Sequence, residues 1–182
     1  MVPLALAVLL LAAPSKAKMT DPLEQMAAAV SFSAPKGWTR SAHANGPDPV
    51  LELRSGLDRI VLRLFGGPDS AYATPELFLR GPAAGTLGAP PETVGEALVA
   101  GRKRTLYQHG YPLMSAVSPV PGADGRPPLA LERYVVLPLA NGRFVVAGHA
   151  YESPIPSARP DGARAFEAFL KTLKAAPKKK RR

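Results

Sequence analysis

Residues 131–151 read LERYVVLPLANGRFVVAGHAY, and this stretch decides the fold. It holds two apolar runs, 131–139 and 143–151, on either side of Asn141-Gly142. An Asn-Gly pair between two such runs is a strong signal for a β-hairpin, because both residues tolerate the positive φ of a tight turn. The stretch therefore predicts two antiparallel strands joined by a short turn.

A second hairpin is predicted nearer the N-terminus. The segment VLELR, residues 50–54, alternates leucine with charged residues, which is the period-two pattern of a half-buried strand. The segment DRIVLRLF, residues 58–65, is a more apolar strand, and Ser55-Gly56 between the two is a turn signal. A further short strand is expected over residues 29–34.

The segment 92–111 fits two structures. Residues 92–100 could form a helix that ends at Gly101, or a strand that turns back at Gly101 into a second strand. Gly95 and the Thr-Leu-Tyr run at 105–107 favour the hairpin, because glycine weakens a helix and the run has strong β propensity.

Two helices are predicted. Thr74 and Pro75 form a typical helix start, and Gly81 ends that helix after about two turns. The segment 161–174 is amphipathic, with an apolar stripe at positions i, i+3, i+4 and i+7. That stripe consists of Phe166, Phe169, Leu170 and Leu173.

These elements predict an α+β fold. An antiparallel sheet of about six strands carries the short helix and the C-terminal amphipathic helix packed on it. We assign residues 1–17 to a signal peptide and 18–28 to a linker. Residues 29–175 form a single α+β domain, and 176–182 form a basic disordered tail.

The N-terminal segment predicts export. The apolar run VPLALAVLLLAAP, residues 2–14, is shorter than the roughly 20 residues that span a bilayer, but it fits the core of a secretory signal. Ser15 and Ala17 suit the −3 and −1 positions, so that cleavage would leave Lys18 first. We expect a periplasmic or secreted protein. The alternatives are an uncleaved N-terminal anchor in the inner membrane and a cytosolic chain that starts at Met19.

The positive charge is concentrated at one end of the chain. The chain has 23 basic and 14 acidic residues, a net charge of +9, whereas residues 21–177 carry only +2. A run of five cations predicts a possible anion-binding site with weak contact to anionic lipid. The run predicts no specific recognition of nucleic acid. It is equally consistent with a terminal segment that only increases solubility. The run is Lys178, Lys179, Lys180, Arg181 and Arg182.

No catalytic, cofactor or metal site is predicted. The absence of cysteine excludes disulfides, thiol catalysis and Cys-based zinc sites. The three histidines, His43, His109 and His149, lie in different elements and lack the close spacing of metal ligands. Glu92 and Glu96 could be paired carboxylates, but nothing marks them as buried, so we interpret them as solvated. We therefore expect a protein that is not an enzyme.

The body of the chain resembles the Mog1/PsbP-like family. The residues that carry the resemblance are FSAPKGW at 32–38, RYVV at 133–136, and the paired aromatics Phe166 and Phe169 of the final helix. The resemblance implies an antiparallel sheet of about six strands between helices, and a role in binding or assembly. Members include a photosystem extrinsic subunit, a partner of a small GTPase, bacterial envelope proteins and secretion chaperones. The family offers no catalytic residues to transfer.

The sequence thus leads to two functional hypotheses. The first is an exported, non-enzymatic binding or assembly domain with an unidentified protein partner. Its interaction surface would be the sheet face that the C-terminal helix leaves uncovered, or the loops at 81–91 and 119–128. The second is a cytosolic chaperone or adaptor for a secretion-system or other protein partner. A hydrolase would need histidine and carboxylate side chains that converge in a pocket.

Overall fold

The computed structural model describes residues 21–86, 89–113, 129–153 and 161–176. The predicted signal peptide (1–17), the loop at 119–128 and the cationic residues 178–182 lie outside these ranges. Within the described residues, no helix is both long and apolar enough to cross a membrane.

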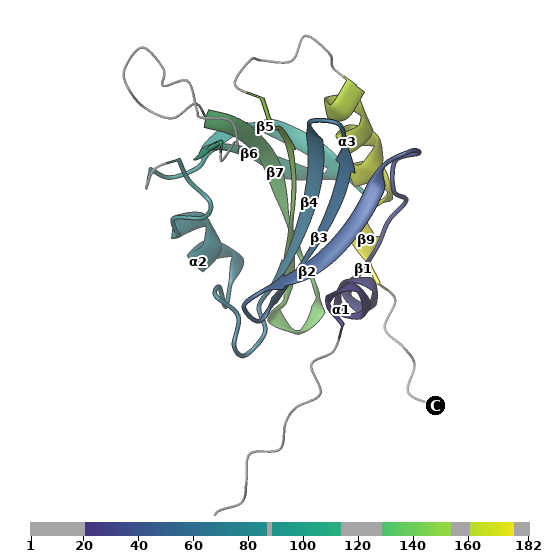
Figure 1. The fold of residues 1–182 in the computed structure, drawn as a ribbon. Helices are drawn as coiled ribbons and strands as arrows, with labels where there is room; N and C mark the ends of the chain where they lie inside the picture. Colours follow the sequence, from purple (N-terminus) through teal and green to yellow (C-terminus); the bar gives the residue numbers. More distant parts are fainter. Residues whose placement is uncertain (1–20, 87–88, 114–128, 154–160, 177–182) are drawn as a thin grey trace, which may run out of the picture.

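The chain has the predicted α+β fold, built on a seven-stranded antiparallel sheet (Figure 1). Its spatial order is β2-β3-β4-β8-β7-β6-β5, so that β2 and β5 form the two edges. The sheet has one strand more than the expected six. The strands are β2 (Thr39–Asn45), β3 (Asp48–Ser55), β4 (Asp58–Phe65), β5 (Glu92–Val99), β6 (Arg102–Pro112), β7 (Leu129–Pro138) and β8 (Phe144–Tyr151).

The predicted hairpins are confirmed. Asn141 (φ 63°) and Gly142 (φ 73°) turn β7 into β8, and Pro138 pairs with Phe144 at the end of that hairpin. The ambiguous segment 92–111 is the β5–β6 hairpin, not a helix. The non-local pairing of β4 with β8 then joins the two halves of the chain into one sheet.

The ends of the domain differ from the prediction. Residues 22–28, assigned to a linker, belong to helix α1 (Pro22–Ala29), whose N-cap Asp21 accepts a hydrogen bond from the N–H of Leu23 at 2.9 Å. The C-terminal helix α3 (Asp161–Thr172) ends before Lys174 instead of including it. Strand β9 (Lys174–Ala175) follows and pairs with β1 (Val30–Ser31) in a separate two-stranded sheet.

The larger core lies on the sheet face that α1 and α3 cover. Met26 of α1 and the predicted stripe of α3 are buried against inward-facing residues of β3, β4, β7 and β8. Trp38 is half-buried against this core. The buried apolar residues of α3 and its end are Phe166, Phe169, Leu170 and Leu173.

The opposite face carries a smaller aromatic core under α2 (Pro75–Arg80). This helix starts at the predicted N-cap Thr74, whose hydroxyl accepts a hydrogen bond from the N–H of Leu77. Phe78 anchors it, with only 2% of its surface exposed. Helix α2 covers only part of the face, and charged side chains occupy the rest. The cluster contains Phe65, Phe78, Ala84, Tyr134, Phe144 and Val146.

Candidate functional site

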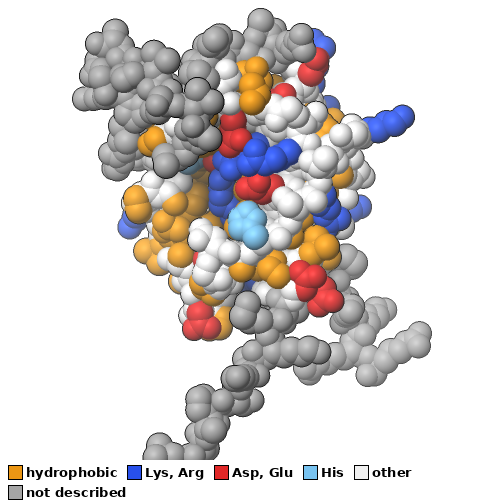
Figure 2. All heavy atoms as spheres, viewed as in Figure 1, with side chains coloured by type: hydrophobic (Ala, Val, Ile, Leu, Met, Phe, Trp, Pro, Cys, Tyr) orange, Lys and Arg blue, Asp and Glu red, His pale blue; other side chains and the backbone are white. Residues whose placement is uncertain are grey.

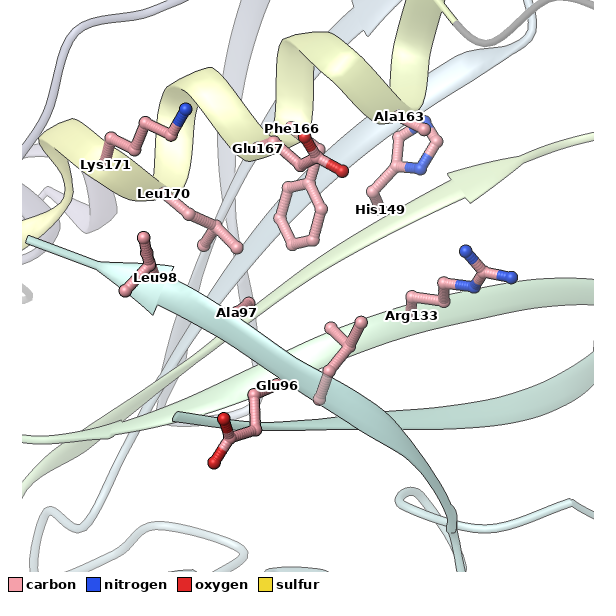
Figure 3. A pocket seen from close by; sticks show the side chains of 11 residues that line it. Glu96, Ala97, Leu98, Arg133, His149, Ala163, Phe166, Glu167, Leu170 and Lys171 are labelled. Carbon is pink, nitrogen blue, oxygen red and sulfur yellow. The ribbon is translucent and has the colours of Figure 1, made fainter. Parts of the chain in front are cut away.

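A groove runs between α3 and the strands β5, β6, β7 and β8 (Figure 3). It has a volume of about 280 Å³. Its floor is apolar because side chains of the α3 stripe meet apolar side chains of β5 and β6 there. Ala97, Leu106, Phe166 and Leu170 line this floor. The groove offers space for an apolar side chain of a partner.

The rim of the groove carries charges of both signs. Glu167 and Lys171 come from α3, while Arg133 comes from β7 and lies across the groove from the helix (Figure 3). Arg133 donates a hydrogen bond from Nε to the side-chain oxygen of Gln108 at 3.1 Å. Glu96 of β5 completes the rim, and its carboxylate lies 2.7 Å from the ammonium of Lys103. These groups can bind polar atoms of an occupant whose apolar part fills the floor.

Strand β5 forms the open side of the groove. It lies at the end of the strand order and, among the residues that the structure describes, it pairs with β6 alone. An edge strand presents unpaired N–H and C=O groups to which an extended chain can add. Leu98 on this strand is 48% exposed and also lines the groove. The free edge and the groove are therefore one continuous surface.

His149 and Asp58 hold the first turn of α3 against the sheet. His149 Nε2 lies 2.9 Å from Asp58 Oδ1, and its ring stacks on Phe166 with the ring centres 5.7 Å apart. A Cβ at Gly162, in the first turn of α3, would collide with the Asp58 carboxylate. The close approach of this turn to Asp58 thus requires glycine. The His149–Asp58 pair therefore helps to fix where α3 lies on the sheet, and α3 forms one wall of the groove.

A buried ionic network occupies the other face of the sheet. The carboxylate of Glu132, 1% exposed, receives hydrogen bonds from both terminal nitrogens of Arg63 at 2.7 and 3.0 Å. His109 Nε2 lies 3.1 Å from the same carboxylate. Burial opposes ionisation of Glu132, but Arg63 and His109 more than compensate and hold its pKa well below the usual range. A Cβ at Gly148 would collide with this carboxylate, so glycine leaves the space for it.

The network continues toward the surface. Arg59 Nε lies 3.0 Å from Glu152, and its terminal nitrogen donates to the hydroxyl of Tyr111 at 3.0 Å. Arg54 bridges Glu152 and Glu52 at 2.8 and 3.0 Å. Burial raises the pKa of Tyr111 to about 12. Figure 2 shows basic and acidic side chains side by side near the centre of the visible surface.

A second cavity, of about 290 Å³, adjoins this network. Arg59, Arg63, His109, Tyr111 and Glu132 line it together with Pro82, Ala83, Gly85, Gly110 and Pro112. A histidine and a carboxylate thus converge at this cavity, as the hydrolase alternative requires, with His109 Nε2 3.1 Å from Glu132. The loop at 81–91 thus contributes a wall to it. The cationic side chains at this cavity already bind carboxylates of the protein. Fewer charged groups at this cavity are therefore free to bind a ligand than at the groove under α3.

The structure does not bring the three histidines together. His43 is exposed on β2, whereas His109 and His149 lie on opposite faces of the sheet and pair with Glu132 and Asp58. Two of the three thus have carboxylate partners that the sequence analysis did not predict. Among the described residues, no three or more His, Asp or Glu side chains are grouped so that they could hold a metal ion.

The sequence comparisons identify no relative of this chain. No protein-family model matches it, and no curated protein is significantly similar to it. The resemblance to the Mog1/PsbP-like family therefore depends on the short motifs at 32–38 and 133–136 and on the paired aromatics Phe166 and Phe169. Function has to be inferred from the groove, its rim and the adjoining edge strand.

Proposed function

We propose that this chain is an exported, non-enzymatic binding or assembly domain that holds an extended polypeptide partner. The partner adds to the free edge of β5 and places an apolar side chain in the groove under α3. The observation that carries this proposal is the continuity of the groove with an edge strand. Backbone pairing with β5 supplies affinity, and the groove selects the side chain.

The charges on the rim fit a polypeptide better than a plain hydrocarbon. Arg133 and Lys171 can bind acidic side chains of the partner, and Glu167 can bind a basic one. An apolar small molecule would leave these groups without new partners. The partner expected here is therefore a segment with one large apolar residue flanked by charged residues.

The environment of His109 supports a role without catalysis. His109 contacts Glu132 through Nε2, while its Nδ1 lies 3.3 Å from the carbonyl oxygen of Gly85. A general base needs a ring nitrogen that faces the substrate. Both nitrogens of His109 already face protein atoms. The resemblance to the Mog1/PsbP-like family, whose members bind or assemble, supports the same proposal.

The proposed surface differs from the one that the sequence suggested. The sheet face away from α3 carries helix α2, the aromatic cluster and the ionic network, whose charges are paired with one another. The loop at 119–128 lies outside the described residues. We therefore place the interaction beside the C-terminal helix, not on the face that this helix leaves uncovered.

A photo-crosslinking amino acid at Leu98 tests this assignment in the native host. We expect a defined polypeptide adduct at Leu98, and none when the same amino acid replaces Leu77, a similarly exposed leucine on α2. The variant Ala97→Phe fills the groove and should remove the adduct while the melting temperature stays within a few degrees of the parent. Identical adducts at both leucines, or an adduct of small-molecule mass only, would contradict the proposal.

The proposed export is tested by the intact mass of the protein from its own host. Cleavage before Lys18 would leave the described residues intact, because α1 begins only at Pro22. A mass that starts at Lys18 supports an envelope or secreted partner. A mass that starts at Met1 or Met19 contradicts a cleaved signal, and the chaperone or adaptor hypothesis then replaces export.

A further inference from the structure

A polar pocket of about 370 Å³ lies at one end of the sheet. Three connections between strands meet there, namely the β2–β3 turn, the loop after β4 and the β7–β8 turn, all at the lower end of the sheet in Figure 1. None of its lining residues lines the groove under α3. The lining consists of Gln25, Pro47, Asp48, Gly66, Gly67, Pro68, Asp69, Ser70, Asn141 and Arg143.

Specific contacts hold the walls of this pocket together. A Cβ at Gly66 (φ 87°) would collide with the carbonyl oxygen of Gly142, so glycine allows the loop after β4 to approach the β7–β8 turn. The N–H of Gly66 donates to the hydroxyl of Ser70 at 3.0 Å, which closes the loop on itself. The N–H of Ala71 donates to Oδ2 of Asp48 at 3.0 Å and ties the same loop to the start of β3. The pocket is therefore built into the folded domain.

Two opposite charges line this pocket without meeting each other. Arg143 is half-buried, and its Nε is buried with no hydrogen-bond partner among the described residues. Asp48 is 4% exposed, and within the same ranges its carboxylate accepts only the hydrogen bond from Ala71. Neither side chain forms an ion pair in the part of the chain that the structure describes. Because a buried charge without a partner is costly, opposite charges supplied from outside the chain would stabilise both side chains.

The charge pattern of the lining limits what the pocket can hold. A third charged residue, Asp69, is exposed in the loop after β4, so two carboxylates face one guanidinium. The two carboxylates would repel a phosphate or another dianion, and Arg143 would repel a metal ion. A molecule that carries one carboxylate and two cationic groups matches all three side chains. A free basic amino acid has this set of charges.

We propose that this pocket binds a free basic amino acid such as lysine. The ligand carboxylate binds the terminal nitrogens of Arg143, the α-ammonium binds Asp48, and the side-chain cation lies near Asp69 on the solvent side. A guanidinium matches the geometry of a carboxylate, and hydrogen bonds between charged groups are the strong ones. The volume of about 370 Å³ lies within the range of small-molecule sites. The site is separate from the groove, so this inference does not rest on the proposed function.

Isothermal titration of the full chain with L-lysine tests the proposal. We expect saturable binding with a Kd of about 1 mM or tighter. Cadaverine, which lacks the carboxylate, and Nα-acetyl-lysine, which lacks the α-ammonium, should each bind at least about tenfold more weakly. Norleucine, which lacks the side-chain cation, should also bind more weakly than lysine. Absence of lysine binding, or equally tight binding of cadaverine, would overturn the proposal.

Substitutions assign each end of the ligand to one side chain. Arg143→Gln and Asp48→Asn should each weaken lysine binding at least about tenfold. Asparagine at position 48 retains an oxygen that can accept the hydrogen bond from Ala71, so the loop should stay in place. Asp69→Asn should weaken the binding of lysine but not that of norleucine. The control Arg133→Gln removes a guanidinium from the rim of the groove and should leave lysine binding unchanged.

Melting temperatures distinguish a lost site from a lost fold. Saturating lysine should raise the melting temperature of the parent and of Arg133→Gln, but not that of Arg143→Gln. Arg143→Lys keeps the charge but loses the paired N–H donors, so it should restore only part of the binding. Full lysine binding by Arg143→Gln would show that the pocket is not the site. The groove proposal would survive that outcome, because the crosslink at Leu98 does not depend on it.

Discussion

Replacing Glu132 with glutamine should destabilise the domain markedly. The substitution keeps the shape of the side chain but removes the only negative charge that binds Arg63 through two hydrogen bonds. Loss of one partner of a buried ion pair costs about 3–5 kcal/mol, because the remaining charge stays buried without compensation. The Arg63 side chain keeps a quarter of its surface exposed, so water can reach it in part. We therefore expect about 3 kcal/mol, the lower end of that range.

The assay is urea unfolding followed by the fluorescence of Trp38, the single tryptophan, which is half-buried against the larger core. In thermal unfolding followed by the same fluorescence, a loss of about 3 kcal/mol should lower the melting temperature by about 6–12 °C in a domain of this size. The matched control is Glu96→Gln, whose carboxylate is 59% exposed in its pair with Lys103 and should leave the midpoint unchanged. Adding Arg63→Met to Glu132→Gln should recover part of the loss, because no unpaired charge then remains buried.

The pH dependence gives a second test of the same reasoning. Because folding lowers the pKa of Glu132, its stabilisation is complete above the unfolded pKa of about 4.3 and is lost as the pH falls below that value. About pH 3 lies 1.3 pH units below it, so the difference between parent and Glu132→Gln should shrink there by roughly 1.8 kcal/mol. A variant within about 1 kcal/mol of the parent at neutral pH would refute the account. So would a difference that is unchanged between about pH 5 and pH 3.

Three smaller perturbations test other contacts. Gly162→Ala should destabilise the domain by about 1 kcal/mol and lower the melting temperature by a few degrees, because the new Cβ displaces the Asp58 carboxylate. A rise in the melting temperature would mean that Asp58 can move aside freely. Thr74→Ala removes the N-cap of α2 and should cost about 1 kcal/mol in urea unfolding, whereas Thr74→Ser should restore most of it. In a titration followed by phenolate absorbance, Tyr111→Phe should remove a step near pH 12 and none near pH 10, because burial raises the pKa of Tyr111 to about 12.

The sequence predicted the fold where the signals are local. The Asn141-Gly142 turn and the alternation in 50–54 depend on neighbouring residues, so both hairpins could be placed without tertiary information. The apolar stripe in 161–174 likewise predicted which face of α3 is buried. The β4–β8 pairing could not be predicted, because it joins strands about 90 residues apart and no local pattern encodes it.

Helix α1 was missed although its start carries a readable signal. Asp21-Pro22 is the same arrangement of N-cap and N1 proline as Thr74-Pro75, from which helix α2 was predicted correctly. Residues 22–29 have only one fully buried side chain, Met26, so the apolar stripe that identified α3 is absent here. The Asp21-Pro22 cap alone was a reason to doubt the assignment of residues 18–28 to a linker.

Most of the candidate site lay beyond sequence reasoning. The sequence predicted that Phe166 and Leu170 pack against the sheet. It could not predict the groove, because the groove forms only where α3 crosses the sheet beside an edge strand. The ionic network needs the register of β4, β8 and β7, since Arg63 and Glu132 are 69 residues apart. Arg59 and Arg63 lie four positions apart, and so on the same face of a largely apolar strand, which was the one available sign of buried charge pairing.

The pairing of β1 with β9 affects when this protein can fold. Met26 and Val30, close to the start of the domain, share one core with Leu173, close to its end. During synthesis the N-terminal residues emerge long before Leu173 does, so that core cannot close until Leu173 has left the ribosome. Until then the larger core is incomplete, and a secretion channel, which accepts extended polypeptide, could still engage the chain.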